Sequence, residues 1–195
     1  MTKTIQCLLQ SYLGESQARN RYSFWASIAK KEGFEQIAEI FTTTAEQEKR
    51  HAKTFYEFLI KLNKESTTPT KIDTNMDMEI HVIMGTTADN LKAAVEGENE
   101  EATMLYPKFA DIAQEEGYPE IAAKFRAIAH AEEHHKQNYE KLLQLLESGT
   151  YFKDRGIQTR TCRECGYMVV GPEAPKLCPS CDHPQSYFEK LQNEY

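Results

Sequence analysis

Glutamates interrupt the apolar stripes of four helix-like segments, and two of them are followed three residues later by a histidine. The residues are Glu15, Glu48 with His51, Glu98 with Glu101, and Glu132 with His135. A carboxylate at a core-facing position is costly unless a nearby cation compensates its charge. Two metal ions would provide that compensation. The set is typical of a carboxylate-bridged di-iron or di-manganese site inside a four-helix bundle.

The segment around Glu48 has an apolar face that one carboxylate breaks. Phe41, Ala45, Glu48 and Ala52 follow one another at spacings of three and four residues, which keeps them on one side of a helix. His51 lies one turn beyond Glu48 on the same side. A single Glu-x-x-His in an acidic protein is ordinarily a solvated surface pair. Two such pairs at matched positions, with carboxylates on two further helices, favour a metal site.

An internal repeat relates the two Glu-x-x-His pairs. The stretch EGFEQIAEIFTTTAEQEKRH (32–51) aligns without gaps on EGYPEIAAKFRAIAHAEEHH (116–135), an offset of 84 residues. The alignment matches Glu48 with Glu132 and His51 with His135. Three neighbouring residues have no identical counterpart, and we expect them at the surface or beside the ligands: His130, Glu133 and His134.

Each repeat predicts one helical hairpin, so the fold class is an all-α four-helix bundle followed by a small module. Gly33 and Gly117 follow long helical patterns and suit left-handed C-terminal caps. Residues 64–79 break the periodicity and predict the crossover between hairpins. The expected helices are 3–31, 34–63, 79–116 and 118–147. The expected domains are a bundle at 1–149, a linker at 150–157 and the module at 158–195.

A register slip distinguishes the two halves. The Gly-Glu of 14–15 matches that of 97–98 at an offset of 83 residues, which indicates a π-bulge within 98–106. The same helix carries Glu101, a fifth carboxylate beyond the four that would neutralise two ferrous ions. Oxidation raises the metal charge and favours another oxygen ligand. We therefore hypothesise that Glu101 binds the oxidised metal and gives way to a neutral imidazole on reduction.

Two tyrosines are also matched by the repeat, Tyr22 and Tyr106. Either they are core aromatics, or their phenols donate hydrogen bonds to ligand carboxylates and help to handle protons. The sequence leaves both interpretations open.

The C-terminal segment contains a second candidate metal site. Two C-x-x-C motifs separated by twelve residues are formed by Cys162, Cys165, Cys178 and Cys181. This spacing is a strong signal for a tetrahedral thiolate site, whose metal would supply folding energy to so small a module. Gly166 and Asp182 follow the two motifs and tolerate positive φ. Spacing does not separate a structural zinc ribbon from a one-iron electron-transfer site, although a neighbouring redox site favours iron.

Composition limits the partners. The chain has 195 residues, a net charge of -7 and a pI of about 5.5, which argues against nucleic acid or an anionic membrane. It has no apolar run of membrane-spanning length and no N-terminal leader pattern. Because four cysteines have metal-ligand spacing and Cys7 stands alone, we expect a reducing cytoplasm. No GxGxxG fingerprint is present, so direct NAD(P)H binding is not expected.

The order of these motifs resembles the rubrerythrin family. The matching elements are GESQARNRY (14–22), AEQEKRHA (45–52), GENEE (97–101) with LYPKFADIAQEEGY (105–118), AEEHH (131–135) and the C-terminal CxxCGY…CPxC. The resemblance implies a ferritin-like bundle with a non-haem di-iron site, followed by a β-rich rubredoxin-like domain with one Fe(Cys)4 site. Asp182 departs from the glycine that the family often has at this position.

The resemblance also implies an activity. Such proteins are cytoplasmic peroxide reductases of oxidative-stress defence, usually homodimers or larger, in which the thiolate iron of one subunit feeds the di-iron site of another. The implied roles are bridging ligands (Glu48, Glu132), terminal carboxylates (Glu15, Glu98), an imidazole ligand (His135) and a redox-exchanging pair (Glu101, His51).

We therefore expect reduction of hydrogen peroxide to water, with electrons supplied by a donor protein or an NAD(P)H-dependent reductase. Rival functions for the same bundle are ferroxidase activity or iron storage, a non-enzymatic electron carrier, and an oxidase that uses dioxygen.

Overall fold

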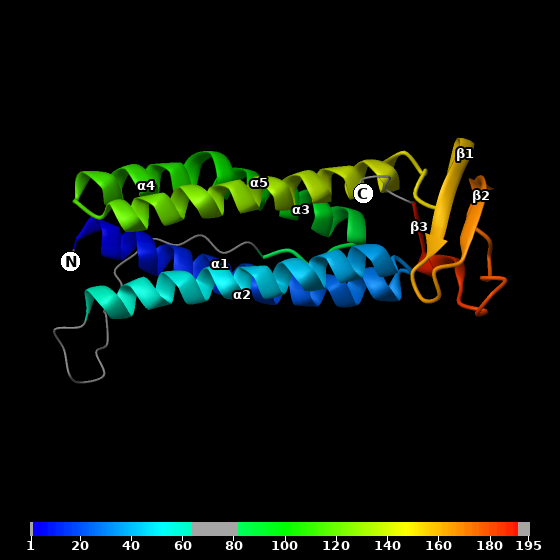
Figure 1. The fold of residues 1–195 in the computed structure, drawn as a ribbon, viewed down its shortest axis with the longest axis horizontal. Helices are drawn as coiled ribbons and strands as arrows, with labels where there is room; N and C mark the ends of the chain where they lie inside the picture. The colour runs from blue at the N-terminus through cyan, green and yellow to red at the C-terminus, as the bar shows by residue number, and fades with distance from the viewer. Residues whose placement is uncertain (1, 64–81, 191–195) are drawn as a thin grey trace.

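The computed structural model describes residues 2–63 and 82–190. Four long helical rods lie side by side, and a small sheet domain lies at one end of them (Figure 1). The rods are α1 (Lys3–Lys31), α2 (Glu35–Leu62), α3 (Thr87–Glu100) continued by α4 (Tyr106–Glu115), and α5 (Pro119–Glu147). α1 packs with α2, and α3–α4 with α5, as the repeat predicted (Figure 1). The all-α bundle followed by a β-rich domain is confirmed.

Matched residues end and cap the helices of both halves. Gly33 and Gly117 each have a φ of +83°, the left-handed conformation expected for them. The residue after each glycine donates its N–H to the carbonyl five residues back over 2.8 Å. These hydrogen bonds satisfy carbonyl groups that the helix ends would otherwise leave unpaired.

Two matched glutamates tie the hairpins together. Glu116 accepts hydrogen bonds from the N–H groups of Lys3 and Thr4, at 3.0 and 2.8 Å, where α1 begins. Glu32 accepts one from the N–H of Thr87, at 3.0 Å, where α3 begins. A carboxylate at a helix N-terminus pairs with free donors and with the positive end of the helix dipole. Each repeat therefore caps the first helix of the other.

The third rod begins later than the sequence predicted. We expected a helix from residue 79, but α3 begins at Thr87. The reason is a reciprocal capping box, in which the Thr86 hydroxyl accepts from the Asp89 N–H while the Asp89 carboxylate accepts from the Thr86 N–H. This start signal overrides the apolar residues before it. The crossover expected at 64–79 lies outside the described residues.

The predicted irregularity in this rod is confirmed. A π-helical turn, Glu101–Leu105, separates α3 from α4. It lies within the segment where the register slip placed an extra residue. The turn puts Glu101 and Tyr106 on the side of the rod that faces the other helices, since Tyr106 is buried and its hydroxyl reaches α1.

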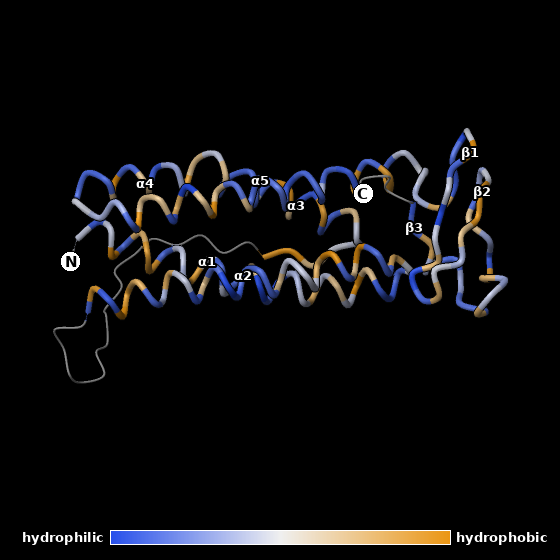
Figure 2. The backbone as a smooth tube through the Cα atoms, viewed as in Figure 1, coloured by the Kyte–Doolittle hydropathy of each residue, from blue (hydrophilic) through white to orange (hydrophobic). Residues whose placement is uncertain are grey.

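The bundle has two apolar clusters, with polar residues towards solvent along each helix (Figure 2). One cluster is built around Phe55, Tyr106, Phe109 and Phe125. The other is built around Tyr22, Trp25, Phe41 and Tyr139. A phenol from each cluster donates to a buried glutamate. The buried carboxylates therefore lie between the two clusters.

The C-terminal domain is an antiparallel three-stranded sheet with strand order β2-β1-β3. Its strands are β1 (Lys153–Cys162), β2 (Met168–Glu173) and β3 (Phe188–Lys190). β1 pairs Lys153 with Glu173 before an irregularity in register, so the strand takes up most of the segment 150–157 that we expected as a linker. Phe152 stacks on Phe34 of the bundle with ring centroids 5.9 Å apart. Within the described ranges, none of the helices has the length and hydropathy needed to cross a bilayer.

Candidate metal centres

The glutamates and histidines predicted as bundle ligands come from all four rods and meet between them. Their atoms form two overlapping groups, Glu15–Glu48–His51–Glu132 and Glu48–Glu98–Glu132–His135. In each group, one atom from every residue lies within 4.8 Å of the others. Glu48 and Glu132 belong to both groups. Two adjacent ions with two bridging carboxylates would fit this arrangement.

The buried polar atoms of these residues have few partners outside the cluster itself. The carboxylates are closed off from solvent, with side-chain exposures of 0 to 2%. Several of their atoms make no well-formed hydrogen bond: Glu15 Oε2, Glu48 Oε1, Glu98 Oε2, both oxygens of Glu132, and His135 Nδ1. Convergent buried carboxylates with so few donors are strongly disfavoured unless cations or protons compensate their charge. Four carboxylates match the charge of two divalent ions, so the residues fit a pair of bound metals.

Gln47 fixes the orientation of His135 and was missed in the sequence. The His135 Nε2 lies 2.9 Å from Gln47 Oε1. An amide oxygen only accepts, so Nε2 carries a proton, and Nδ1, which faces the carboxylates, is the nitrogen that would bind a metal once its own proton is lost. Such a partner sets the tautomer of a metal-binding imidazole. The repeat gives no hint of this role, because the residue matched with Gln47 is Ala131.

Without cations, protons compensate the cluster. Burial and the charge of Glu48 raise the pKa of Glu98 to about 8, and the same causes raise the pKa of Glu15 well above its usual range. Burial opposes ionisation of Glu48, but hydrogen bonds from His135 and His51 outweigh it and lower its pKa to about 2. Burial also lowers the pKa of each histidine, yet the carboxylates raise His51 to about 9 and His135 to about 12. Metal binding must therefore release protons.

Both tyrosines donate to predicted ligands. The Tyr22 hydroxyl on α1 donates to Glu98 Oε1 on α3 over 2.5 Å. The Tyr106 hydroxyl on α4 donates to Glu15 Oε1 on α1. Burial raises the pKa of both phenols well above their ordinary value, so they remain protonated donors. Of the two interpretations left open by the sequence, the structure supports the hydrogen-bonding one.

Glu101 lies beside the two groups rather than within either of them. It begins the π-helical turn, and its Oε1 is 3.9 Å from the place where a Cβ on Gly14 would stand. Burial, followed by the charge of Glu98, raises its pKa well above the ordinary range. His51 is a member of a group and has the most exposed side chain of the grouped residues, at 15%.

The three neighbouring residues expected at the surface or beside the ligands all reach solvent to some extent. His130 and His134 are exposed, and Glu133 pairs with Lys136 over 2.7 Å. None of the three is a member of a ligand group within the described ranges.

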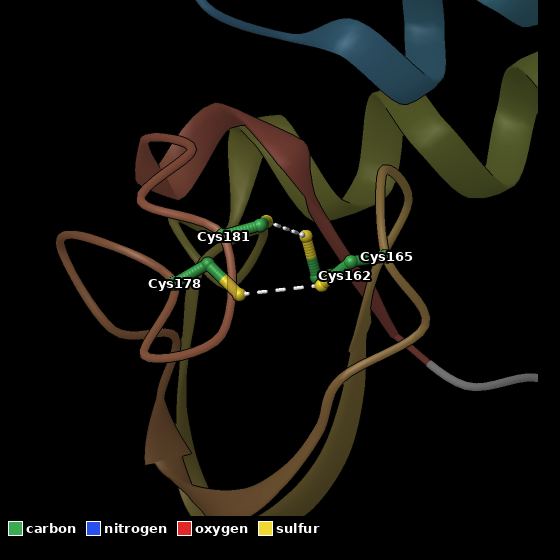
Figure 3. A group of neighbouring side chains, drawn as sticks. All are labelled: Cys162, Cys165, Cys178 and Cys181. Atoms are coloured by element: carbon green, nitrogen blue, oxygen red, sulfur yellow. Dashed lines mark hydrogen bonds between the residues drawn. The ribbon is translucent and has the colours of Figure 1, made fainter.

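The four cysteines of the second candidate site converge at one end of the sheet domain (Figure 3). The Sγ atoms of Cys162 and Cys181 are 3.8 Å apart, and those of Cys165 and Cys178 are 3.6 Å apart. A tetrahedron with metal–sulfur bonds of about 2.3 Å has edges of about 3.8 Å. The sulfurs are too far apart for disulfides and stand where one tetrahedral ion would hold them.

The backbone around these cysteines has the same turn twice. In each C-x-x-C turn, the N–H of the first cysteine donates to the carbonyl five residues later, at 2.9 and 2.8 Å. Gly166 and Asp182 have φ of +73° and +59°, so both adopt the left-handed conformation expected for them. The Tyr167 N–H donates to the sulfur of Cys165 and lowers its pKa to about 6. Backbone donors of this kind favour thiolates.

Comparison with known proteins covers both parts of the chain. Residues 6–143 match the family model for rubrerythrin, and residues 161–189 match the model for the rubrerythrin rubredoxin-like domain. A rubrerythrin of Porphyromonas gingivalis is 50% identical over 100% of this chain and 92% of its own length. A putative rubrerythrin of Methanocaldococcus jannaschii is 48% identical over 100% of this chain and 96% of its own length.

Solved structures show the same architecture. A structure described as the fully reduced, all-ferrous state of nigerythrin matches with a TM-score of 0.63 at 26% identity, covering 96% of this chain and 86% of its own. Partially reduced and mixed-valence states of nigerythrin match similarly, each with a TM-score of 0.62. The bacterioferritin BfrA of Mycobacterium tuberculosis matches with a TM-score of 0.64 over 76% of this chain and 90% of its own. Its identity of 18% shows the ferritin-like fold alone.

These matches agree with the chemistry of the two centres. The carboxylate–histidine groups form a site for a di-iron pair, and the four cysteines form a rubredoxin-like iron site. Membership at this level of identity also makes the protein an oxidoreductase. The chain belongs to the rubrerythrin family.

Proposed function

We propose that this protein reduces hydrogen peroxide to two waters at the bundle site, with electrons drawn from its thiolate iron. One observation carries the proposal: two ligand groups that share Glu48 and Glu132 occur in the same chain as a separate four-cysteine centre. Iron storage requires no built-in electron source. A peroxidase that must be re-reduced after each turnover does require one.

The ligand roles follow from this proposal. Two ferrous ions bound side by side would supply the two electrons that peroxide takes up, and the thiolate iron would replace them one at a time. We assign Glu48 and Glu132 as bridges because each belongs to both groups. Glu15 and Glu98 each belong to one group and would be terminal ligands, as would His135.

Glu101 and His51 would exchange on one ion. His51 belongs to the group that contains Glu15, and Glu101 lies outside both groups, next to Gly14. The partial exposure of His51 leaves its imidazole room to swing outward. Entry of Glu101 would add one negative charge when oxidation adds positive charge to the metals.

Protons are held next to the ligands. Reduction of peroxide consumes two protons, and the Tyr22 and Tyr106 hydroxyls hold protons against Glu98 and Glu15. Both phenols are buried, so each can share its proton with the carboxylate and recover it without exchange to bulk water. The two phenols would thus move protons beside the metals, while the two protons consumed overall would come from solvent.

Electrons would arrive from outside the bundle. A cavity of about 400 Å³ between α2, α5 and the sheet domain is lined by Gln47, His135 and Arg163. It gives the His135 side of the site an opening towards a donor. Within one chain, Arg163 pairs with Glu39, which lies nine residues before Glu48 on α2, about 13 Å along the axis. Arg163 follows Cys162 in the chain, so this contact places the four-cysteine domain against the Glu39 end of α2. We propose a homodimer or larger assembly in which the thiolate iron of another subunit docks nearer to the bundle site.

The source of these electrons would be a donor protein or an NAD(P)H-dependent reductase, because the sequence contains no dinucleotide fingerprint. We place the protein in the cytoplasm, where its thiolates remain reduced. Like nigerythrin, for which partially reduced and mixed-valence states are described, this chain would pass through a half-reduced state, since electrons come singly.

Anaerobic mixing experiments test the function. Fully reduced, iron-loaded protein is mixed with hydrogen peroxide or with dioxygen, and the visible absorption of the ferric thiolate centre is followed. Rapid return of colour with peroxide, and slow return with dioxygen, is expected. A faster response to dioxygen would contradict the proposal and favour an oxidase. A thiolate site that stays colourless in iron-replete protein would indicate zinc and remove the internal electron source.

A further inference from the structure

Each half of the bundle surrounds its ligand-bonded tyrosine with three aromatic side chains. Around Tyr106 they are Phe55, Phe109 and Phe125. Around Tyr22 they are Tyr139, Trp25 and Phe41. The 84-residue repeat matches these sets position by position, Phe55 with Tyr139, Phe109 with Trp25 and Phe125 with Phe41. We call the set around Tyr106 the phenyl box. We call the set around Tyr22, which contains a tryptophan and a second tyrosine, the oxidisable box.

Two of the three matched ring pairs have nearly the same spacing in both boxes, whereas Tyr106 and Phe109 are 6.4 Å apart and Tyr22 and Trp25 are 5.5 Å apart. Tyr106 and Phe55 have ring centroids 5.7 Å apart, and Tyr22 and Tyr139 are 5.6 Å apart. The centroid of Phe125 is 5.9 Å from Tyr106, and that of Phe41 is 5.8 Å from Tyr22. At the position of Tyr139, packing is therefore met equally well by phenylalanine. What differs is chemistry, because a phenol or an indole can give up one electron to a biological oxidant and a phenyl ring cannot.

Tyr139 places a buried hydroxyl, which faces the Thr44 side chain, where the other half has the plain phenyl ring of Phe55. The two rings pack alike, so the hydroxyl is the difference between these matched positions.

The oxidisable box connects the metal site to the edge of the bundle. Tyr22 donates its hydroxyl proton to Glu98 over 2.5 Å and lies 5.5 Å from Trp25, centroid to centroid. Trp25 Nε1–H donates in turn to the carbonyl of Ile83 over 3.1 Å, and Ile83 is 37% exposed. The phenyl box has no such continuation, since the three rings beyond Tyr106 are all phenyl groups.

We propose that Tyr22 and Trp25 form an electron reservoir that supplies one electron when peroxide meets a half-reduced metal site. This inference rests on the proposed peroxide reduction. Peroxide takes two electrons and two protons to give two waters. The half-reduced site supplies one electron and Tyr22 supplies the other, while solvent supplies the two protons and the phenol proton of Tyr22 moves to Glu98.

The electron hole left on Tyr22 then moves away from the metals. Trp25 gives one electron to Tyr22, which takes its proton back from Glu98, and Trp25 becomes a radical cation that keeps its N–H bonded to the Ile83 carbonyl. Tyr139 lies against Tyr22, with ring centroids 5.6 Å apart, but among the described residues its hydroxyl has no carboxylate to take its proton, so the electron hole rests on Trp25. A later electron from the thiolate iron reduces Trp25 back to its neutral form. The reservoir thus completes the reduction of peroxide when only one metal electron is present.

The internal repeat supplies the test variant. Trp25→Phe/Tyr139→Phe copies the phenyl box, whose geometry the fold already accommodates. The matched control is Tyr12→Phe/Tyr56→Phe. It removes two phenol hydroxyls from a tilted ring pair outside both boxes, whose centroids are 5.3 Å apart. Iron-loaded holoprotein with an oxidised thiolate centre and a half-reduced bundle site is mixed with hydrogen peroxide and freeze-quenched. Paramagnetic resonance measures protein radicals, and peptide mass mapping locates oxidation at Trp25, the only tryptophan.

The proposal predicts a protein radical and oxidised Trp25 in the wild type and in the control, and loss of both in the phenyl-box copy. Equal radical yield in the copy, oxidation centred on Tyr106, or no radical in the wild type would overturn it. A parallel arm mixes the fully reduced proteins with peroxide, and all three should react at the same rate. If the fully reduced wild type does not react with peroxide, the peroxide proposal is overturned as well. If it reacts fast but the half-reduced wild type forms no radical, only the reservoir is overturned.

Discussion

Removal of the Tyr106 hydroxyl should weaken metal binding while leaving the bundle folded. In the Tyr106→Phe variant the ring keeps its place among Phe55, Phe109 and Phe125, at centroid distances of 5.7 to 6.4 Å. Only the hydrogen bond to Glu15 is lost. In the metal-free protein Glu15 holds its own proton, because burial raises its pKa. The phenol therefore stabilises the ionised, metal-binding form more than the free form.

The size of the effect follows from that difference. A hydrogen bond to a charged group contributes about 1.5–3 kcal/mol. At about 1.4 kcal/mol per factor of ten, the affinity should fall about 10- to 150-fold. The loss should concern the ion held by the group that contains Glu15, whereas Tyr22→Phe should weaken the ion held by the group that contains Glu98.

Anaerobic calorimetry with ferrous iron, or with cobalt(II) as a less reactive substitute, measures this. Wild type should show two binding events at the bundle, besides that of the four cysteines, and each variant should weaken a different one of the two. Tyr56→Phe is a suitable control because that side chain is exposed and lies outside the ligand groups. Unchanged affinity for both ions in Tyr106→Phe would refute the reasoning, as would equal weakening of both ions in each single variant.

Three further predictions concern protons and the sheet domain. In metal-free protein the folded state holds protons more tightly than the unfolded state at Glu98 (pKa about 8 against 4.5) and at His51 and His135 (about 9 and about 12 against 6.5). Its free energy of unfolding should therefore fall as pH rises from about 5 to about 9, measured by thermal unfolding after chelation; a rise would contradict the assignment. Cys178→Ser should unfold the sheet domain and leave the helices intact, which limited proteolysis with circular dichroism would detect; a protease-resistant domain would argue against a metal-dependent fold. Asp182→Ala should destabilise that domain by about 1 kcal/mol while Asp182→Gly should not, because only glycine relieves a φ of +59°; equal melting temperatures for the two would show that the turn carries no strain.

The sequence predicted the features that leave a mark on residue spacing. A glutamate in an apolar stripe is conspicuous, so all the residues of both ligand groups were identified. The π-helical turn was also predictable, because one extra residue shifts the register of the repeat from 84 to 83. The left-handed glycines at 33 and 117 follow from the ends of the periodic segments.

Features that depend on contacts across the bundle could not be predicted. Tyr22 and Tyr106 could have been packing residues, because the sequence gives no distance between helices. Gln47 acts on His135 from another helix and has no counterpart in the repeat. The start of α3 was misplaced because the capping box at residues 86–89 competes with an apolar stretch. The similarity of the two aromatic boxes became apparent only when their ring distances could be compared.

The central claim is that electrons from the thiolate iron reach peroxide through the bundle site. The direct test is anaerobic stopped-flow of fully reduced wild type and of Glu48→Ala, mixed with hydrogen peroxide while ferric thiolate colour is followed. Glu48 belongs to both ligand groups, so the variant disables the bundle site without touching the cysteines. The account predicts rapid colour return in wild type and only slow return in Glu48→Ala. Equally rapid return in both would mean that peroxide oxidises the thiolate iron directly, and would contradict the account.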